Sequence, residues 1–171
     1  MSKILVAYYS RADENYAVGT VEVGNTELLA REIVKQTGAD EFKIDTIKPY
    51  AVDYATSIEE AKRELTENAR PDYKGEIDLS AYDTIFLGFP IWWGDLPMVV
   101  YKFIEDHDFA GKTVIPFNTH EGSGNSGTYS HLKSMLAGAT LQGDGFNLTG
   151  REARTADGLN AVDAWLEKLG F

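Results

Sequence analysis

Two uninterrupted apolar runs constrain the fold of this chain more than any other feature. Residues 4–9 read ILVAYY, and residues 84–89 read TIFLGF. A strand with one face in water alternates apolar and polar side chains, whereas a strand covered on both faces is apolar throughout. The two runs therefore predict central strands of a parallel sheet. Within residues 42–46, Phe42, Ile44 and Thr46 alternate with the charged Lys43 and Asp45. This alternation predicts a strand near the sheet edge with one face in water.

Helical periodicity fills the gaps between the predicted strands. Apolar side chains recur at three- and four-residue spacing from residue 25 to residue 37, and Gly38 is placed to end that helix. Similar spacing recurs around residues 58–65, 98–104, 132–136 and 159–169. Residues 113–119 are predicted to form a fourth strand, in which Pro116 has no N–H to donate to a neighbouring strand. Residues 140–149 form a weak fifth strand interrupted by glycines. This alternation predicts a doubly wound α/β fold with helices on both faces of a parallel sheet.

Composition limits the class of protein. A length of 171 residues fits a single domain spanning residues 1–171. The absence of cysteine excludes disulfides, thiolate zinc sites and iron–sulfur clusters. The net charge of −11 argues against nucleic-acid binding and favours basic partners. Neither a secretory signal nor an apolar run of membrane-spanning length is recognisable, so we expect a cytoplasmic protein without membrane contact.

Ligands of doubly wound sheets bind beyond the carboxyl ends of the strands, so the loops that follow the strands hold the candidate site. The first such loop begins at Ser10 and Arg11 and ends with Asn25 and Thr26 at a helix N-terminus. Hydroxyl and amide groups around free backbone N–H groups favour an anion such as phosphate, to which Arg11 would add a positive charge. Plain capping of the helix by Asn25 or Thr26 is the alternative.

The second loop reads PIWWGDLP and places Trp92 and Trp93 side by side after a buried strand. Indole rings suit stacking on a planar conjugated ring, and Gly94 lets the backbone approach such a ring closely. Packing under the next helix is the alternative explanation, which we expect for one tryptophan and not for both.

The third loop reads HEGSGNSG from His120 to Gly127 and offers consecutive backbone donors. It formally matches G-x-G-x-x-G, but that dinucleotide fingerprint normally opens the first β–α unit of a sheet, and here it follows the fourth strand. His120 has three open roles: a cofactor contact, a proton donor or an ordinary loop residue. No second histidine lies at a metal-ligand spacing, so we expect no metal site.

The runs FLGFPIWWGDLP and GKTVIPFNTHEGSG resemble the flavodoxin family, and the resemblance extends over essentially the whole chain. It implies an FMN-binding, flavodoxin-like five-stranded parallel sheet of order 2-1-3-4-5. It also implies three groups of cofactor-binding residues: a phosphate cradle of Ser10, Asn25 and Thr26 with Arg11 as a further candidate; one wall of the isoalloxazine pocket from Pro90, Ile91, Trp92, Trp93 and Gly94; and a second wall from Thr119, His120, Glu121, Gly122, Ser123 and Gly124.

The segment between Arg11 and Gly24 departs from the short loop of the family. Its acidic residues Asp13, Glu14 and Glu22 would repel a phosphate, so we expect them to face solvent. The long loop has two possible roles, a pocket for a second planar substrate or a dimer contact, so a monomer and a homodimer both remain open.

The resemblance favours an electron carrier of low potential that docks on basic patches of redox partner proteins. The alternative is an FMN-dependent NAD(P)H:quinone-type oxidoreductase, with His120 as a candidate proton donor. A receiver-type signalling domain has the same topology, but it needs acidic residues where Tyr9, Ser10 and Pro90 stand.

Overall fold

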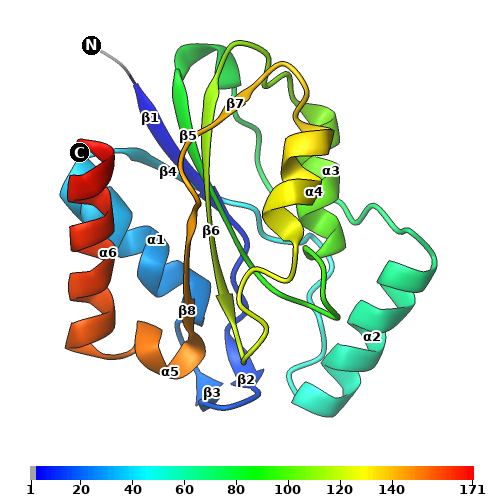
Figure 1. Ribbon diagram of the computed structural model, residues 1–171. Coiled ribbons are helices and arrows are strands. Elements are labelled where there is room, and N and C mark those ends of the chain that lie inside the picture. The colour runs from blue at the N-terminus through cyan, green and yellow to red at the C-terminus, as the bar shows by residue number, and fades with distance from the viewer. Residues whose placement is uncertain (1–2) are drawn as a thin grey trace.

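The computed structural model describes residues 3–171, and its main sheet is parallel. The strand order is β4 (Asp40–Lys43), β1 (Ile4–Tyr8), β5 (Thr84–Pro90) and β6 (Thr113–His120), with β7 (Thr140–Leu141) and β8 (Phe146–Thr149) both paired to the outer side of β6 (Figure 1). In chain order of the parallel strands this is the predicted 2-1-3-4-5. The difference from the prediction is that the fifth strand is in two pieces.

Pro116 explains why the fifth strand is divided. The amide of Gln142 donates to the carbonyl of Val114 at 3.0 Å, so Val114 directs its polar groups toward the fifth strand. Pro116 lies two residues further along and directs its main chain to the same side. It has no N–H to donate there. The break between β7 and β8 falls opposite Pro116, between the pairs Val114–Leu141 and Phe117–Phe146.

The second strand occupies other residues than predicted. Strand β4 covers Asp40–Lys43, whereas the sequence favoured residues 42–46. The amide of Asp45 donates to the carbonyl of Lys43 at 3.0 Å, a tight three-residue turn that diverts the chain from the sheet. Thr46 instead forms an isolated antiparallel bridge with Tyr73.

Helices cover both faces of the sheet, as Figure 1 shows. One face carries α1 (Asn25–Thr37), the short α5 (Gly150–Ala153) and α6 (Ala156–Leu169), and the other carries α3 (Met98–Asp106) and α4 (Thr128–Met135). Helix α2 (Tyr54–Thr66) projects beyond the carboxyl ends of the strands, and a 3₁₀ turn covers Leu79–Ala81. Among the helices described for residues 3–171, none combines the length and apolar character that a bilayer crossing requires.

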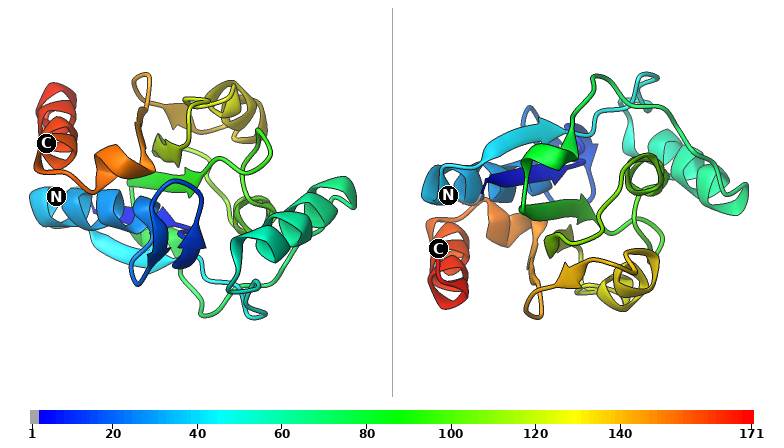
Figure 2. Two further views of the ribbon diagram at one scale, coloured as in Figure 1. Left: turned by 90° about the horizontal axis from the view of Figure 1, so that it is seen from below. Right: turned by 90° about the horizontal axis from the view of Figure 1, so that it is seen from above.

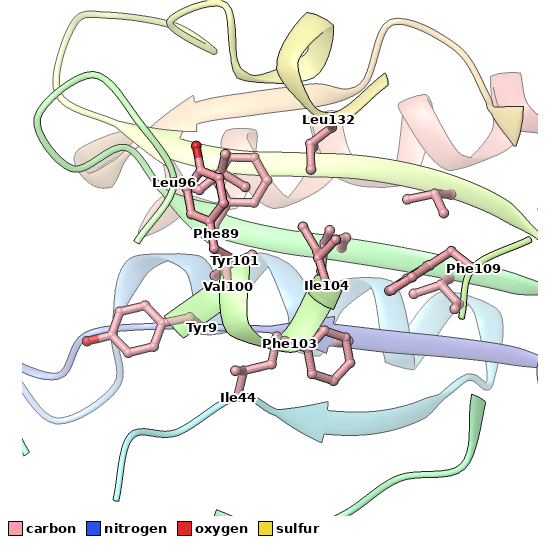
Figure 3. Close-up of a cluster of buried hydrophobic side chains, with 14 of the residues drawn as sticks. Tyr9, Ile44, Phe89, Leu96, Val100, Tyr101, Phe103, Ile104, Phe109 and Leu132 are labelled. Carbon is pink, nitrogen blue, oxygen red and sulfur yellow. The ribbon is translucent and has the colours of Figure 1, made fainter. Parts of the chain in front are cut away.

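Burial follows the alternation of side chains along β1. Leu5, Ala7 and Tyr9 belong to the core beneath α3 and α4, whereas Val6 and Tyr8 belong to the core beneath α1 and α6. Figure 3 shows the first of these clusters, in which side chains of α3 and α4 meet those of the central strands. Because β1 is buried on both faces, the uninterrupted apolar run of the sequence is explained.

The long first loop contains a hairpin that the sequence did not predict. Strands β2 (Asp13–Asn15) and β3 (Gly19–Val21) pair antiparallel below the main sheet (Figure 1). The two ends of this insertion meet, because a Cβ atom built on Gly24 would lie 2.4 Å from the carbonyl oxygen of Arg11 and 2.2 Å from Ser10 Oγ. Only glycine fits between these atoms, so Gly24 closes the base of the hairpin.

Candidate functional site

A cavity of about 260 Å³ opens at the carboxyl edge of the sheet, where the loops after β1, β5 and β6 meet. Figure 2, left, looks onto this edge, with the hairpin and α2 beside it. Ten predicted site residues line the cavity: Arg11, Asn25, Thr26, Pro90, Ile91, Trp92, Trp93, Thr119, His120 and Glu121. The other five, Ser10, Gly94, Gly122, Ser123 and Gly124, lie in the same loops and outside the lining.

The N-terminus of α1 forms one end of the cavity. Its cap is Gly24, which corrects the expectation that Asn25 or Thr26 caps the helix. Ser10 Oγ accepts a hydrogen bond from the amide of Glu27 at 3.0 Å, so the loop after β1 supplies the capping group. Among residues 3–171, no group accepts a hydrogen bond from the amides of Asn25 and Thr26. Unpaired amides at the positive end of a helix dipole attract anions.

Side-chain hydrogen bonds fix this end of the cavity. The hydroxyls of Thr26 and Thr119 lie 2.7 Å apart and are buried, which joins the start of α1 to the end of β6. Asn25 Oδ1 accepts from Arg154 Nη1 at 2.7 Å. Arg154 also donates to the carbonyl of Val23 at 3.1 Å. Sequence reasoning did not find Arg154, because it lies directly after α5, far along the chain from Asn25.

The two tryptophans have different environments. Trp92 is half-buried, and its ring meets Tyr9 and Tyr50 edge to face, with centroids 5.1 Å away in both pairs. Trp93 is 48% exposed, its Nε1 donates to the carbonyl of Ile58 at 2.9 Å, and Lys62 Nζ lies 5.0 Å from the ring centroid. Trp92 is thus a fixed part of the cavity wall, and Trp93 forms an edge of its mouth against α2.

Trp93 has a strained backbone. Trp92 and Asp95 exchange two main-chain hydrogen bonds of 2.9 and 3.0 Å, with only Trp93 and Gly94 between them. Both central residues have positive φ, +52° and +77°, as a type I′ turn requires. Glycine adopts this conformation freely, whereas for tryptophan it is unfavourable. Backbone strain of this kind clusters at functional sites in proteins.

Side-chain hydrogen bonds stabilise the conformation of the loop after β6. The imidazole Nδ1 of His120 accepts a hydrogen bond from the amide of Gly122 at 2.9 Å, so the neutral ring carries its proton on Nε2. The buried Asn118 donates from Nδ2 to the carbonyl of Gly124 at 3.0 Å. Desolvation raises the pKa of the Glu121 carboxyl above its ordinary value, an effect that the nearby amide of Gly150 opposes.

Arg11 lines the cavity, and its guanidinium holds neighbouring loops together. Nε donates to the carbonyl of Glu14 at 3.0 Å, and Nη2 lies 2.9 and 3.0 Å from the carbonyls of Ala51 and Val52. Glu14 completes the junction, because its carboxylate accepts from the amide of Tyr54 at 2.5 Å. The carboxylate of Glu14 therefore binds the first amide of α2 and does not face open solvent, whereas Glu22 is exposed as expected.

Six lining residues escaped sequence reasoning: Asn15 and Tyr16 from the hairpin, and Tyr54, Ser57, Ile58 and Ala61 from α2. In α2, Tyr54, Ile58 and Ala61 recur at helical spacing, a signal that the sequence contains. The face that this spacing predicts looks into the cavity at these three residues. The hairpin residues carry no such signal.

Comparisons with known proteins agree with this architecture. A sequence profile described as flavodoxin matches residues 3–169. No curated protein matches the chain. A Bacteroides uniformis ATCC 8492 protein assigned as a flavoprotein has 30% identity and a TM-score of 0.74, with 97% of this chain and 98% of that one covered. A second, from Bacteroides eggerthii DSM 20697, has 29% identity and a TM-score of 0.77, with 100% and 99% covered.

A third solved structure contains a ligand. It is a flavoprotein in complex with FMN from Lactobacillus acidophilus NCFM, with 19% identity and a TM-score of 0.68 over 96% of this chain and 99% of that one. At this identity the likeness concerns the fold.

Proposed function

Because this chain belongs to the flavodoxin family, we propose that it is an FMN-binding redox protein that carries electrons between partner proteins at low potential. FMN is the cofactor, as family membership supports. When bound, the flavin supplies the one- and two-electron chemistry, and the protein holds it and sets its electron affinity.

The unpaired amides of Asn25 and Thr26 carry this proposal. They lie in the lining of the same cavity as Trp92, so the cavity combines a site for an anion with an aromatic wall. FMN has the matching parts, a phosphate at one end and a planar ring at the other. Gly24 supports the fit, because a side chain at this position would collide with the loop that surrounds the helix N-terminus.

The charge of the protein bears on the potential. Reduction adds negative charge to the flavin in a chain of net charge −11, and the apolar surface of Trp92 and Trp93 disfavours that charge as well. Arg11 in the lining acts in the opposite direction. Its guanidinium donates hydrogen bonds to three main-chain carbonyls. Their partial negative charges reduce the positive potential that Arg11 adds to the cavity. We therefore expect the acidic background to lower the potential.

A spectroscopic titration tests the proposal. Apoprotein mixed with FMN should shift the visible flavin bands and quench flavin fluorescence with one FMN bound per chain. Anaerobic reduction against dyes of known potential should place the two-electron midpoint below that of free FMN. An unchanged FMN spectrum at saturating protein would refute cofactor binding. A midpoint above that of free FMN would refute the low-potential role.

A second candidate is an FMN-dependent NAD(P)H:quinone-type oxidoreductase. The observation that favours it is the extension of the cavity lining to Tyr16 and Tyr54, flat side chains that are not among the residues assigned to the flavin. His120 Nε2 would be its proton donor. Anaerobic addition of NADH or NADPH separates the two functions. Rapid bleaching followed by turnover with a quinone supports the enzyme, whereas reduction only by dithionite or a partner reductase supports the carrier.

A further inference from the structure

One side-chain amide in the cavity lining has a donor without an acceptor. Asn25 is only 7% exposed and lines the cavity at the N-terminus of α1. Its Oδ1 accepts the hydrogen bond from Arg154, whereas its Nδ2 donates to no residue in the described range 3–171. A buried donor without a partner is rare in proteins and costs free energy. The Nδ2 group therefore indicates a ligand that supplies an acceptor.

Arg154 determines which way this side-chain amide faces. A guanidinium has only donors, so the amide must turn its oxygen toward Arg154. The nitrogen lies toward the start of α5 and the loop after β6, because a Cβ atom built on Gly150 would collide with Asn25 Nδ2 and with Glu121 Oε1. Glu121 lines the same cavity. If the amide were reversed, an oxygen would replace this donor and would repel an anion.

The backbone that carries Arg154 is fixed between two helices. Arg154 follows α5, which lies beside α1 (Figure 2, left), and its amide donates to the carbonyl of Arg151 at 3.1 Å. The next residue, Thr155, caps α6 by accepting from the amide of Gly158 at 3.0 Å. A side chain on Gly158 would collide with the carbonyl of Glu152, so the two helices meet closely at this point. The guanidinium therefore reaches Asn25 from a rigid support.

The two hydrogen bonds of Arg154 flank the cap of α1. Nη1 donates to Asn25 Oδ1 at 2.7 Å, and Nη2 donates to the carbonyl of Val23 at 3.1 Å. Gly24, the cap, lies between these two acceptors. The main-chain amides of Asn25 and Thr26 follow directly, and neither has an acceptor among residues 3–171. Asn25 Nδ2 and these two amides are thus three donors at one helix end.

The charge of Arg154 explains its position less well than its hydrogen bonds do. Arg154 is exposed, and salt screens an exposed charge. Arg151 carries the same charge in α5, is exposed as well, and has Nη2 at 3.5 Å from the carbonyl oxygen of Ala17. An effect of charge is therefore expected from both arginines, whereas the orientation of Asn25 depends on Arg154.

We propose that Arg154 is a positioning residue for the phosphate of FMN, because it holds Asn25 with Nδ2 as a third donor beside the two main-chain amides. This inference rests on the proposed function and adds to it a residue outside the three loops assigned to the flavin. The carboxyl of Glu121 lies on the same side and opposes an anion, so the orientation of Asn25 matters all the more. A flavin without a phosphate gains nothing from this donor. Arg154 therefore contributes to the preference for FMN over riboflavin.

A comparison of FMN with riboflavin is the first test, with both dissociation constants measured by fluorescence titration of the apoprotein. Arg154→Met should raise the FMN constant about tenfold, the loss typical of a hydrogen bond to a charged group, and leave the riboflavin constant unchanged. The matched control Arg151→Met removes the same charge from the same helix and should stay within about twofold of the wild type for both ligands. Arg154→Lys keeps the charge without the planar fork and should raise the FMN constant about threefold, which decides the question if Arg154→Met does not fold.

A double-mutant cycle separates positioning from a general structural role. Asn25→Ala removes the side-chain amide that Arg154 orients. Adding Arg154→Met to Asn25→Ala should then raise the FMN dissociation constant by less than about twofold, because the two residues act as one unit. A second full loss in the Asn25→Ala background would overturn the inference.

Inorganic phosphate distinguishes failure of this inference from failure of the proposed function. In amide NMR spectra of the apoprotein, phosphate should shift the side-chain amide signal of Asn25 and the main-chain amide signals of Asn25 and Thr26. Arg154→Met should bind phosphate about tenfold more weakly than Arg151→Met. If the wild type binds phosphate in this way but not FMN, the proposed function fails and the positioning role of Arg154 stands. Phosphate that leaves these signals unmoved, or equal affinities of the two variants for FMN and phosphate, would refute that role.

Discussion

Trp93 combines an aromatic surface at the cavity mouth with a left-handed backbone, and two substitutions separate these properties. Trp93→Ala and Trp93→Gly both remove the indole, its hydrogen bond to Ile58 and its contact with Lys62. They differ in the cost of φ at +52°. An L-residue pays about 1–2 kcal/mol in this region and glycine does not. Glycine loses about 0.5–1 kcal/mol more conformational entropy on folding than alanine.

The two variants should therefore differ in folding stability by the difference between these two contributions. The glycine variant of the apoprotein should be more stable than the alanine variant by about 0.5–1 kcal/mol. Urea unfolding followed by far-UV circular dichroism measures it. Equal stabilities, or a more stable alanine variant, would mean that the turn at Trp93 is not left-handed in solution.

The same variants test the cavity wall. If the indole stacks on the flavin, both should weaken FMN binding by about 1–3 kcal/mol, by analogy with the stacking of nucleic-acid bases. That is roughly a 5- to 150-fold rise in the dissociation constant. Flavin fluorescence titration measures it. Wild-type affinity in both variants would remove Trp93 from the flavin site and leave Trp92 as the aromatic wall.

Two further predictions follow from the packing. Gly24→Ala inserts a Cβ atom 2.4 Å from the carbonyl oxygen of Arg11. It should destabilise the fold by about 1–3 kcal/mol and weaken FMN binding. Denaturant unfolding and flavin fluorescence titration measure the two effects. Unchanged values would mean that the surrounding loop shifts to accommodate the added methyl group. Burial and the neighbouring Glu32 raise the pKa of Asp163, so its ionisation disfavours the folded state and stability falls as pH rises above the unfolded value of about 3.9. Asp163→Asn should remove this loss and stabilise the protein by a few tenths of a kcal/mol at neutral pH; an Asn variant that follows the wild-type pH profile would contradict it.

The features that the sequence predicted well depend on local physics. Helix α1 covers Asn25–Thr37 and ends at Gly38 with φ of +70°, as its periodicity and glycine indicated. The apolar runs became the central strands because burial on both faces is visible in the residues themselves. Ten candidate site residues share one cavity because parallel strands bring their carboxyl ends to the same edge.

The features that escaped prediction depend on contacts between distant residues. The hairpin is held by Arg11 and Glu14 through groups some 40 positions away, at Ala51, Val52 and Tyr54. No local periodicity records such bonds. The capping of α1 is similar, because the acceptor Ser10 Oγ lies 17 residues before Glu27. The residues adjacent to the helix, Asn25 and Thr26, are therefore the caps that the sequence predicts, in place of Ser10.

The close approach of the hairpin's two ends at Gly24 has a consequence for the insertion as a whole. Arg11 and Gly24, the residues that flank segment 12–23, lie side by side. Removal or exchange of that segment therefore leaves β1 and α1 in the same relative position. Length and sequence there can drift, or be rewritten in the laboratory, without disturbing the sheet. The segment is therefore a point at which a loop of another length or sequence can be inserted while the sheet and α1 keep their places.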